Sequence, residues 1–159
     1  MGILEKMRLD GKKAFVTGGT RGIGRSLAFA LAEAGADVAI VGMHLDSAWD
    51  TAKEIAAATG RDTFACACDI KDASQVEAMV AAVKNRYGRL DVAVCNAGIC
   101  IHTPAESMTL DEWNFVIQTN LTGTFVTNQA AARVMLSQGG GSIINTASMS
   151  RTTAVPTGS

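Results

Sequence analysis

The sequence predicts an α/β fold: a doubly wound, parallel sheet of five strands with helices on both faces. Short apolar runs alternate with segments of helical periodicity from residue 13 onward, which is the pattern of strands joined by helical crossovers. Some runs, such as residues 38–41, are apolar at consecutive positions. Strands that are covered on both faces show this pattern, whereas strands with one exposed face alternate. Right-handed crossovers are expected between successive strands.

Strands are predicted at residues 13–16, 38–41, 63–68, 90–95 and 142–146. The helices between them are placed by their end signals, which are Gly35 after the first helix, Asp46 and Gly60 around the second, and Asp72 and Gly88 around the third. The periodicity of the second helix predicts that Trp49 faces the core.

The last helical stretch begins at a capping box formed by Thr109 and Glu112. It is expected to run to about residue 137, with an interruption near Asn120 and Gly123. Its apolar residues exceed what one buried stripe needs, so we expect part of this helix to form a subunit interface.

A glycine-rich turn at residues 17–24 follows the first strand and leads directly into the first helix. Strand, turn and helix in this order favour a dinucleotide site over a glycine loop without a ligand, as in a Rossmann-type sheet. Gly18 is assigned to the tight turn, Gly22 to close approach of the ligand, and Gly24 to packing of helix on strand. The start of the helix offers free N–H groups to a pyrophosphate. The predicted cofactor-binding residues of the turn are Thr17, Gly18, Thr20, Arg21, Gly22, Ile23 and Gly24.

The end of the second strand bears on the choice of cofactor. NAD sites usually carry Asp or Glu about 20 residues beyond the glycine turn, where it binds the ribose 2′-OH. Here the sequence reads Gly42-Met43-His44, without a carboxylate. Arg21 in the turn has the charge that a 2′-phosphate needs, although a solvated arginine is the alternative. The sequence therefore favours NADP over NAD, with His44 near the adenosine ribose.

Two further strand ends carry candidate cofactor contacts, because ligands of such sheets bind beyond the carboxyl ends of the strands. Asp69 and Ile70 follow the third strand, where a carboxylate accepts a hydrogen bond from an adenine amino group or simply forms a turn. Asn96, Ala97 and Gly98 follow the fourth strand and suit close approach of a cofactor, with a plain turn as the alternative.

These motifs occur together with Asn120, in Asn-Leu-Thr-Gly, and with Ser148. In order and spacing, residues 9 to about 150 resemble the short-chain dehydrogenase/reductase family. The resemblance implies an NAD(P)-dependent oxidoreductase that acts on a carbonyl or alcohol, with a weak indication of a sugar or polyol. It also implies catalytic roles for Asn120, which would hold a proton-relay water by distorting its helix, and for Ser148, which would bind the substrate oxygen. A homodimer or homotetramer is expected on the same ground.

The sequence departs from the family pattern at two places. Cys95 stands where the family commonly has the first Asn of Asn-Asn-Ala-Gly, which is a packing change. The catalytic Tyr-x-x-x-Lys does not occur, and the only tyrosine, Tyr87, is predicted to face the core from a helix. We therefore expect residues 1–159 to be a single dinucleotide-binding domain that lacks the C-terminal part of the fold, leaves the fifth strand as an edge, and is inactive alone.

Composition limits the other possibilities. A net charge of −1 gives no case for nucleic acid or an anionic membrane, and no apolar run or leader predicts a membrane span or secretion. The four cysteines have no metal-ligand spacing and are expected to be buried or half-buried reduced thiols in a cytoplasmic protein. Two alternative functions stay open: a non-catalytic dinucleotide-binding or interaction module, and, with less support, a methyltransferase.

Overall fold

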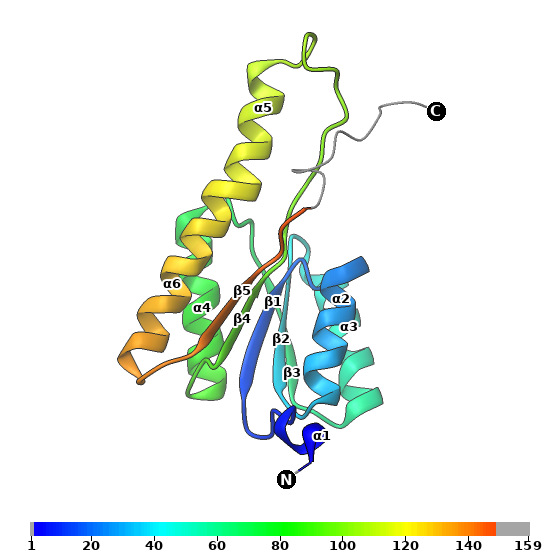
Figure 1. The fold of residues 1–159 in the computed structure, drawn as a ribbon, viewed down its shortest axis with the longest axis vertical. Coiled ribbons are helices and arrows are strands. Elements are labelled where there is room, and N and C mark those ends of the chain that lie inside the picture. Colours follow the sequence, from blue (N-terminus) through cyan, green and yellow to red (C-terminus); the bar gives the residue numbers. More distant parts are fainter. Residues whose placement is uncertain (1, 149–159) are drawn as a thin grey trace.

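The computed structural model describes residues 2–148. Its centre is a five-stranded sheet in which every neighbouring pair of strands is parallel (Figure 1). The strands stand in the order β3-β2-β1-β4-β5. Their bounds are β1 Lys13–Thr17, β2 Asp37–Gly42, β3 Thr63–Ala67, β4 Val92–Cys95 and β5 Ser142–Asn145. The predicted doubly wound parallel sheet is confirmed.

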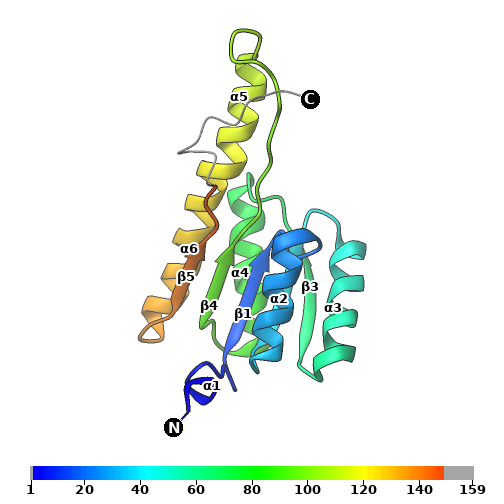
Figure 2. The same ribbon diagram turned by 45° about the vertical axis from the view of Figure 1, so that its right-hand side comes forward.

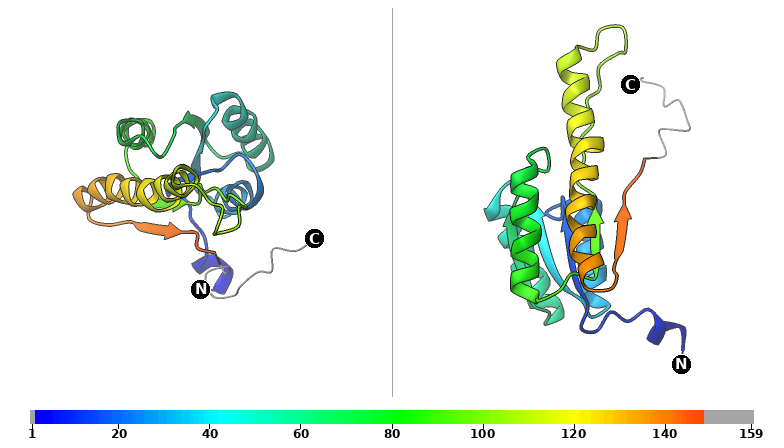
Figure 3. Two further views of the ribbon diagram at one scale, coloured as in Figure 1. Left: turned by 90° about the horizontal axis from the view of Figure 1, so that it is seen from above. Right: turned by 90° about the vertical axis from the view of Figure 1, so that its left-hand side faces the viewer.

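Helices cover both faces of this sheet (Figure 2). Their bounds are α1 Ile3–Lys6, α2 Gly22–Glu33, α3 Leu45–Thr59, α4 Ala73–Tyr87, α5 Leu110–Ile117 and α6 Thr124–Ser137, and a π-helical turn, η1, spans Gln118–Gly123 between the last two. Seen from above, α2 and α3 lie on one side of the sheet and α4 and α6 on the other (Figure 3). The first two crossovers run over one face and the next two over the other, so the face changes once, where the strand order reverses beside β1.

The two faces form two apolar cores because side chains alternate along each strand. In β1, Ala14 and Val16 belong to the core beneath α2 and α3, whereas Phe15 belongs to the core beneath α4 and α6. All three side chains have no solvent exposure. Burial on both faces is therefore the reason that the central strands are apolar at consecutive positions.

The start of the helix agrees with the sequence at two of the three predicted N-terminal caps. The Asp72 carboxylate accepts hydrogen bonds from the backbone N–H groups of Ser74 and Gln75, and Thr109 with Glu112 forms the capping box. The prediction for Asp46 is wrong, because α3 begins at Leu45 with His44 in the capping position. Asp46 lies instead in the first turn of α3, where its negative charge interacts favourably with the positive end of the helix dipole.

Three other predictions need correction. Trp49 is 43% exposed, since the buried face of α3 is made by the smaller side chains of Ala48, Ala52 and Ile55. Cys100 is exposed on the loop after β4, whereas the other three cysteines are buried. Strand β4 begins two residues later than predicted, because the side-chain amide of Gln138 holds both the N–H and the C=O of Leu90.

The predicted interruption of the last helix is confirmed as the π-helical turn η1. Among the helices in the described part of the chain, none is long and apolar enough to cross a membrane. Within residues 2–148, strand β5 pairs with β4 along one side only, and Ile144 on it is 49% exposed.

Candidate functional site

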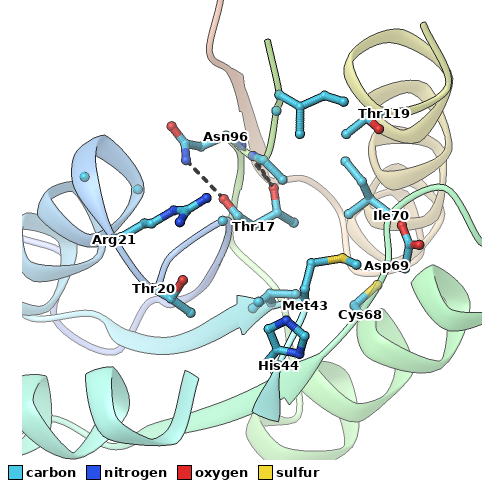
Figure 4. A pocket seen from close by; sticks show the side chains of 18 of the residues that line it. Thr17, Thr20, Arg21, Met43, His44, Cys68, Asp69, Ile70, Asn96 and Thr119 are labelled. Carbon is cyan, nitrogen blue, oxygen red and sulfur yellow. Dashed lines mark hydrogen bonds between the residues drawn. The ribbon is translucent and has the colours of Figure 1, made fainter. Parts of the chain in front are cut away.

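A cavity of about 710 Å³ opens at the carboxyl ends of the strands, where the strand order reverses beside β1 (Figure 4). Open α/β sheets bind ligands at this position. All thirteen residues predicted from the sequence to bind the cofactor line the cavity: Thr17, Gly18, Thr20, Arg21, Gly22, Ile23, Gly24, His44, Asp69, Ile70, Asn96, Ala97 and Gly98. The structure thus brings residues from four strand ends into one site.

The glycine turn forms one wall of this cavity. Gly18 has a φ of +64°, and a Cβ there would lie 3.0 Å from Cα of Ala97. A Cβ on Gly24 would lie only 2.2 Å from the carbonyl oxygen of Gly18, so the turn and the first turn of α2 are in direct contact. At Gly22, in contrast, a Cβ would meet no atom within 4 Å, which leaves space beside the turn for a ligand.

The start of α2 is suited to an anion. Arg21 occupies the capping position with extended backbone, and its side chain makes no capping hydrogen bond. No acidic residue lies in the first turn of the helix. The first N–H groups of a helix lack intrahelical partners and carry the positive end of the dipole, so this end of α2 is complementary to a phosphate group.

Thr17 and Asn96 join the ends of β1, β4 and β5. The Thr17 hydroxyl accepts hydrogen bonds from the backbone N–H groups of Asn96 at 3.0 Å and Ala97 at 3.1 Å. The Asn96 side chain donates to the carbonyl of Thr17 (Figure 4). It also accepts a hydrogen bond from the hydroxyl of Thr146. The side-chain amide of Asn96 therefore connects the ends of these three strands beside the cavity.

The end of β2 is packed closely against the glycine turn. A Cβ at Gly42 would lie 2.6 Å from Cγ2 of Thr20, so the two positions share one space. Met43 and His44 follow and are exposed, and with Ser47 they complete this side of the cavity. Within the lining of the cavity, no carboxylate lies on this side.

The loop after β3, next to the end of β2, forms the side of the cavity away from Thr20 and Arg21 (Figure 4). The Asp69 carboxylate accepts a hydrogen bond from the Lys71 backbone N–H at 3.0 Å and pairs with the Lys71 ammonium at 3.2 Å. The same ammonium lies 4.5 Å from the centre of the Phe115 ring. The loop that contains Asp69 and Ile70 is therefore tied to helix α5 through Lys71.

Asn120 lies in the π-helical turn and binds the loop after β4. Its Oδ1 accepts from the backbone N–H of Ile99 at 2.9 Å, and its Nδ2 donates to the carbonyl of Ile99 at 2.8 Å. The helix around Asn120 is distorted, as the family resemblance implied. In this structure its amide holds backbone, and its catalytic role stays a prediction.

Ser148 lies three residues beyond β5, at the carboxyl ends of the strands, where the cavity also lies. Tyr87 lies at the amino ends of the strands, where its hydroxyl donates to the carbonyl of Asp62 just before β3. Burial, followed by the charges of Asp62 and Asp37, raises the pKa of Tyr87 well above its usual value. Tyr87 is therefore unsuited to proton transfer in the cavity.

Several residues that line the cavity were not among the predicted cofactor-binding residues. They are Val41, Gly42, Met43, Ser47, Cys68, Lys71, Ile99, Phe115 and Thr119. Burial raises the pKa of the Cys68 thiol to about 11, assisted by the charge of Asp69, so this thiol lines the cavity in its neutral form. Phe115 and Thr119 lie four residues apart on one face of the last helical stretch, but no local signal in the sequence directs this face to the cavity.

The chain resembles known proteins over nearly its whole length. It is 42% identical over 151 residues to D-threitol dehydrogenase of Mycolicibacterium smegmatis, covering 93% of this chain and 56% of that protein. It is 41% identical over 143 residues to sorbitol dehydrogenase of Cereibacter sphaeroides, covering 89% and 54% of the two chains. This chain thus spans little more than half the length of these relatives.

Solved structures show the same fold. A short-chain type dehydrogenase/reductase from Mycobacterium marinum superposes with a TM-score of 0.95 at 43% identity, covering 98% of this chain and 63% of the other. An NADPH-dependent 3-quinuclidinone reductase from Rhodotorula rubra gives a TM-score of 0.88 at 31% identity over 94% and 56% of the chains. A 7α-hydroxysteroid dehydrogenase complexed with NADH gives 0.90 at 32% over 96% and 59%.

The structural neighbours thus include proteins that use either nicotinamide cofactor. The model of the short chain dehydrogenase family matches residues 12–159, which include the glycine turn and every strand of the sheet. On this match, the chain belongs to the short chain dehydrogenase family of oxidoreductases.

Proposed function

We propose that this chain is the cofactor-binding part of an NADP-dependent oxidoreductase that interconverts a carbonyl and an alcohol. The observation that carries the proposal is the cavity at the switch in strand order, which combines an uncapped helix N-terminus with a strand end free of carboxylates. The first feature suits the pyrophosphate of a dinucleotide, and the second removes the repulsion that a 2′-phosphate would meet.

The preference for NADP depends on three residues. Arg21 lies at the mouth of the turn without a capping bond, so its guanidinium is available to a phosphate. Gly42 leaves the end of β2 without a side chain, and His44 follows it at the cavity wall. Asp69, on the far side, would accept a hydrogen bond from the adenine amino group.

The roles of the chain's own residues follow from their positions. The glycine turn and the start of α2 bind phosphate, the loop after β3 holds the adenine, and the Thr17–Asn96 contact fixes the loop on which the cofactor would rest. NADPH supplies a hydride when it is bound. Asn120 would hold a water for proton transfer and Ser148 would orient the substrate oxygen.

For the substrate we propose a sugar or polyol and its ketone. The support is the similarity to proteins named D-threitol dehydrogenase and sorbitol dehydrogenase.

For assembly we propose a homodimer or homotetramer, in the cytoplasm, built on the last helical stretch, which consists of α5, η1 and α6. Trp113, Leu121 and Phe125 are 54%, 64% and 60% exposed in the single chain. Large apolar side chains exposed together mark association surfaces. Sedimentation at micromolar concentration distinguishes this assembly from a monomer.

A non-catalytic dinucleotide-binding module is the second candidate. One observation favours it: the amides of Asn96 and Asn120 hold backbone and neighbouring side chains, as structural braces do. Both candidates predict cofactor binding, so turnover by the longest natural form of the protein is the measurement that separates them.

The cofactor proposal is tested by calorimetric titration of NADPH and NADH into the protein and into Arg21→Ala. We expect tighter binding of NADPH, and a loss in the variant of about 1–3 kcal/mol for NADPH only, the scale of a charge-assisted hydrogen bond. Arg25→Ala is a matched control, because Arg25 pairs with Glu54 on α3 and does not line the cavity. Equal or tighter binding of NADH would overturn the preference.

A further inference from the structure

The π-helical turn η1 lies between two loops of the site. Thr119 of this turn is buried and lines the cavity, and Figure 4 shows it close to Ile70 of the loop after β3. The next residue, Asn120, binds Ile99 of the loop after β4 through both of its amide atoms. One six-residue turn therefore contacts the loops that follow two different strands.

The contact with the loop after β3 is made at Gly123. A Cβ on Gly123 would lie 2.8 Å from the carbonyl oxygen of Ile70 and 2.9 Å from its Cγ1. The carbonyl belongs to the backbone, so it cannot rotate away as a side chain can. Ile70 is only 6% exposed, which leaves the loop little room to retreat.

Two neighbouring contacts lie on the same face of the helix. Phe115, Thr119 and Gly123 are spaced by four residues, the spacing that aligns side chains along a helix. Phe115 receives the Lys71 ammonium over its ring, Thr119 lines the cavity, and Gly123 meets Ile70. The loop from Asp69 to Lys71 thus packs against this helix face through Ile70 and Lys71.

The contact with the loop after β4 is equally close. A Cβ on Gly98 would lie 3.3 Å from Oδ1 of Asn120, beside the two hydrogen bonds to Ile99. Asn120 itself does not line the cavity. Its position is therefore set by the turn that carries it and by Ile99.

We infer that Gly123 is a positioning residue for Asn120. Through its contact with the Ile70 carbonyl, a ligand bound at the loop after β3 stabilises the hydrogen bonds between Asn120 and Ile99. The inference rests on the proposed function, because it takes this loop as the adenine subsite. A ligand that fixes Asp69 and Ile70 restrains η1 through Gly123, and Asn120 is restrained with it. π-Helical turns commonly occur at functional sites, and here the turn has two binding partners.

The test uses adenosine 5′-monophosphate, which has the adenine and its ribose but no nicotinamide. Backbone and side-chain amides of the isotope-labelled protein are followed by NMR during titration, and hydrogen exchange of the Ile99 amide is measured with and without the nucleotide. Signals of residues 18–24 report binding itself. We expect bound nucleotide to shift the Asn120 side-chain signals and to slow Ile99 exchange about threefold or more, because exchange follows local opening.

Gly123→Ala places a methyl group against the Ile70 carbonyl and should separate the turn from the loop. We expect nucleotide affinity to fall about 3–10-fold and the effect on Ile99 exchange to vanish, as for any lost coupling between two sites. Thr122→Ala is the matched control, since Thr122 is exposed on the same turn, and it should respond like the unmodified protein.

The outcomes separate the inference from the proposed function. Absence of nucleotide binding to the unmodified protein overturns both. Binding that leaves Asn120 and Ile99 unchanged, or a Gly123→Ala variant that responds like the unmodified protein, overturns the positioning role alone. Should Gly123→Ala fail to fold, the unmodified protein decides: slowed Ile99 exchange supports the inference and unchanged exchange overturns it.

Discussion

Thr20 and Gly42 occupy one space between the glycine turn and the end of β2. A Cβ at position 42 would lie 2.6 Å from Cγ2 of Thr20, whereas the next atoms, in His44 and Ala48, are 3.7 and 3.8 Å away. Thr20 is thus the one close obstacle in the described residues to a side chain at the position where NAD sites usually carry a carboxylate.

The contact predicts that NADH binding improves only when both residues change. Gly42→Asp alone should bind NADH little better, because the new Cβ collides with Thr20. Thr20→Ala/Gly42→Asp should bind NADH about tenfold better than the single variant, a coupling of about 1.4 kcal/mol. Both variants that carry Gly42→Asp should bind NADPH more weakly, since the new carboxylate repels its 2′-phosphate.

Calorimetric titration of both cofactors into the four proteins of this cycle measures the coupling. Thr20→Ala alone controls for loss of the threonine hydroxyl. Additive effects of the two substitutions would show that Thr20 does not obstruct position 42.

Removal of the Thr17 hydroxyl by a nearly isosteric substitution should lower the stability of the protein. Thr17 is 1% exposed, and its oxygen accepts from two backbone N–H groups of the loop after β4. Thr17→Val leaves both donors buried without their partner, so unfolding free energy should fall by about 1–3 kcal/mol. Urea denaturation followed by circular dichroism measures the loss.

Thr63→Val is the matched control for Thr17→Val. Thr63 also lies on a strand, but its hydroxyl donates to the carbonyl of Ala52 and accepts no backbone N–H in the described structure. Its replacement should therefore cost less. Equal losses in the two variants would contradict the role assigned to the Thr17 oxygen.

Asp37 predicts a loss of stability in acid. Burial alone would raise the pKa of its carboxyl, but hydrogen bonds from Lys13, from the Asp62 backbone N–H at 3.1 Å and from Arg61 at 2.8 Å lower it below the usual value. The folded protein therefore binds this proton less readily than the unfolded chain. Its contribution to stability is complete above the unfolded pKa of about 4 and is lost as pH falls through the folded value.

Asp37→Asn should accordingly destabilise the protein by about 1.5–3 kcal/mol at neutral pH, the range for hydrogen bonds to a charged group. The difference from the unmodified protein should shrink below pH about 4. Urea denaturation at several pH values provides the measurement, with Asp10→Asn as the exposed control carboxylate. A difference that stays constant down to pH about 2.5 would contradict this role, because the unfolded chain binds the proton below pH about 4 and the contribution of Asp37 to stability should then fall.

The sequence alone predicted the strands, the glycine turn and the edge of the sheet at which the site lies, because parallel strands buried on both faces leave a strong local pattern. It also predicted the break near Asn120 and Gly123. It did not predict Lys71, Phe115 or Thr119 in the cavity. Their places depend on how the last helix packs against the loop after β3, which no local pattern records.

The caps show the same limit on a smaller scale. Asp72 caps α4, yet Asp46, with a similar position before a helix, does not cap α3. Strand β2 ends at Gly42 and α3 begins at Leu45, so Asp46 already lies inside the helix. Local preference for a capping residue did not place the start of α3.

The last prediction is that the 159-residue chain binds the cofactor without measurable reductase activity. Reduction of a ketone needs a hydride and a proton for the developing alkoxide. Ser148 and Asn120 are not acids with a pKa near neutral, and Tyr87 lies at the amino ends of the strands. Absence of a positioned general acid typically costs about 10²–10⁴-fold in rate. The chain, shown to be folded by circular dichroism, is assayed with NADPH and a panel of ketoses and simple ketones. Turnover within about tenfold of a longer relative would exceed what the missing acid permits, and would show that another residue delivers the proton.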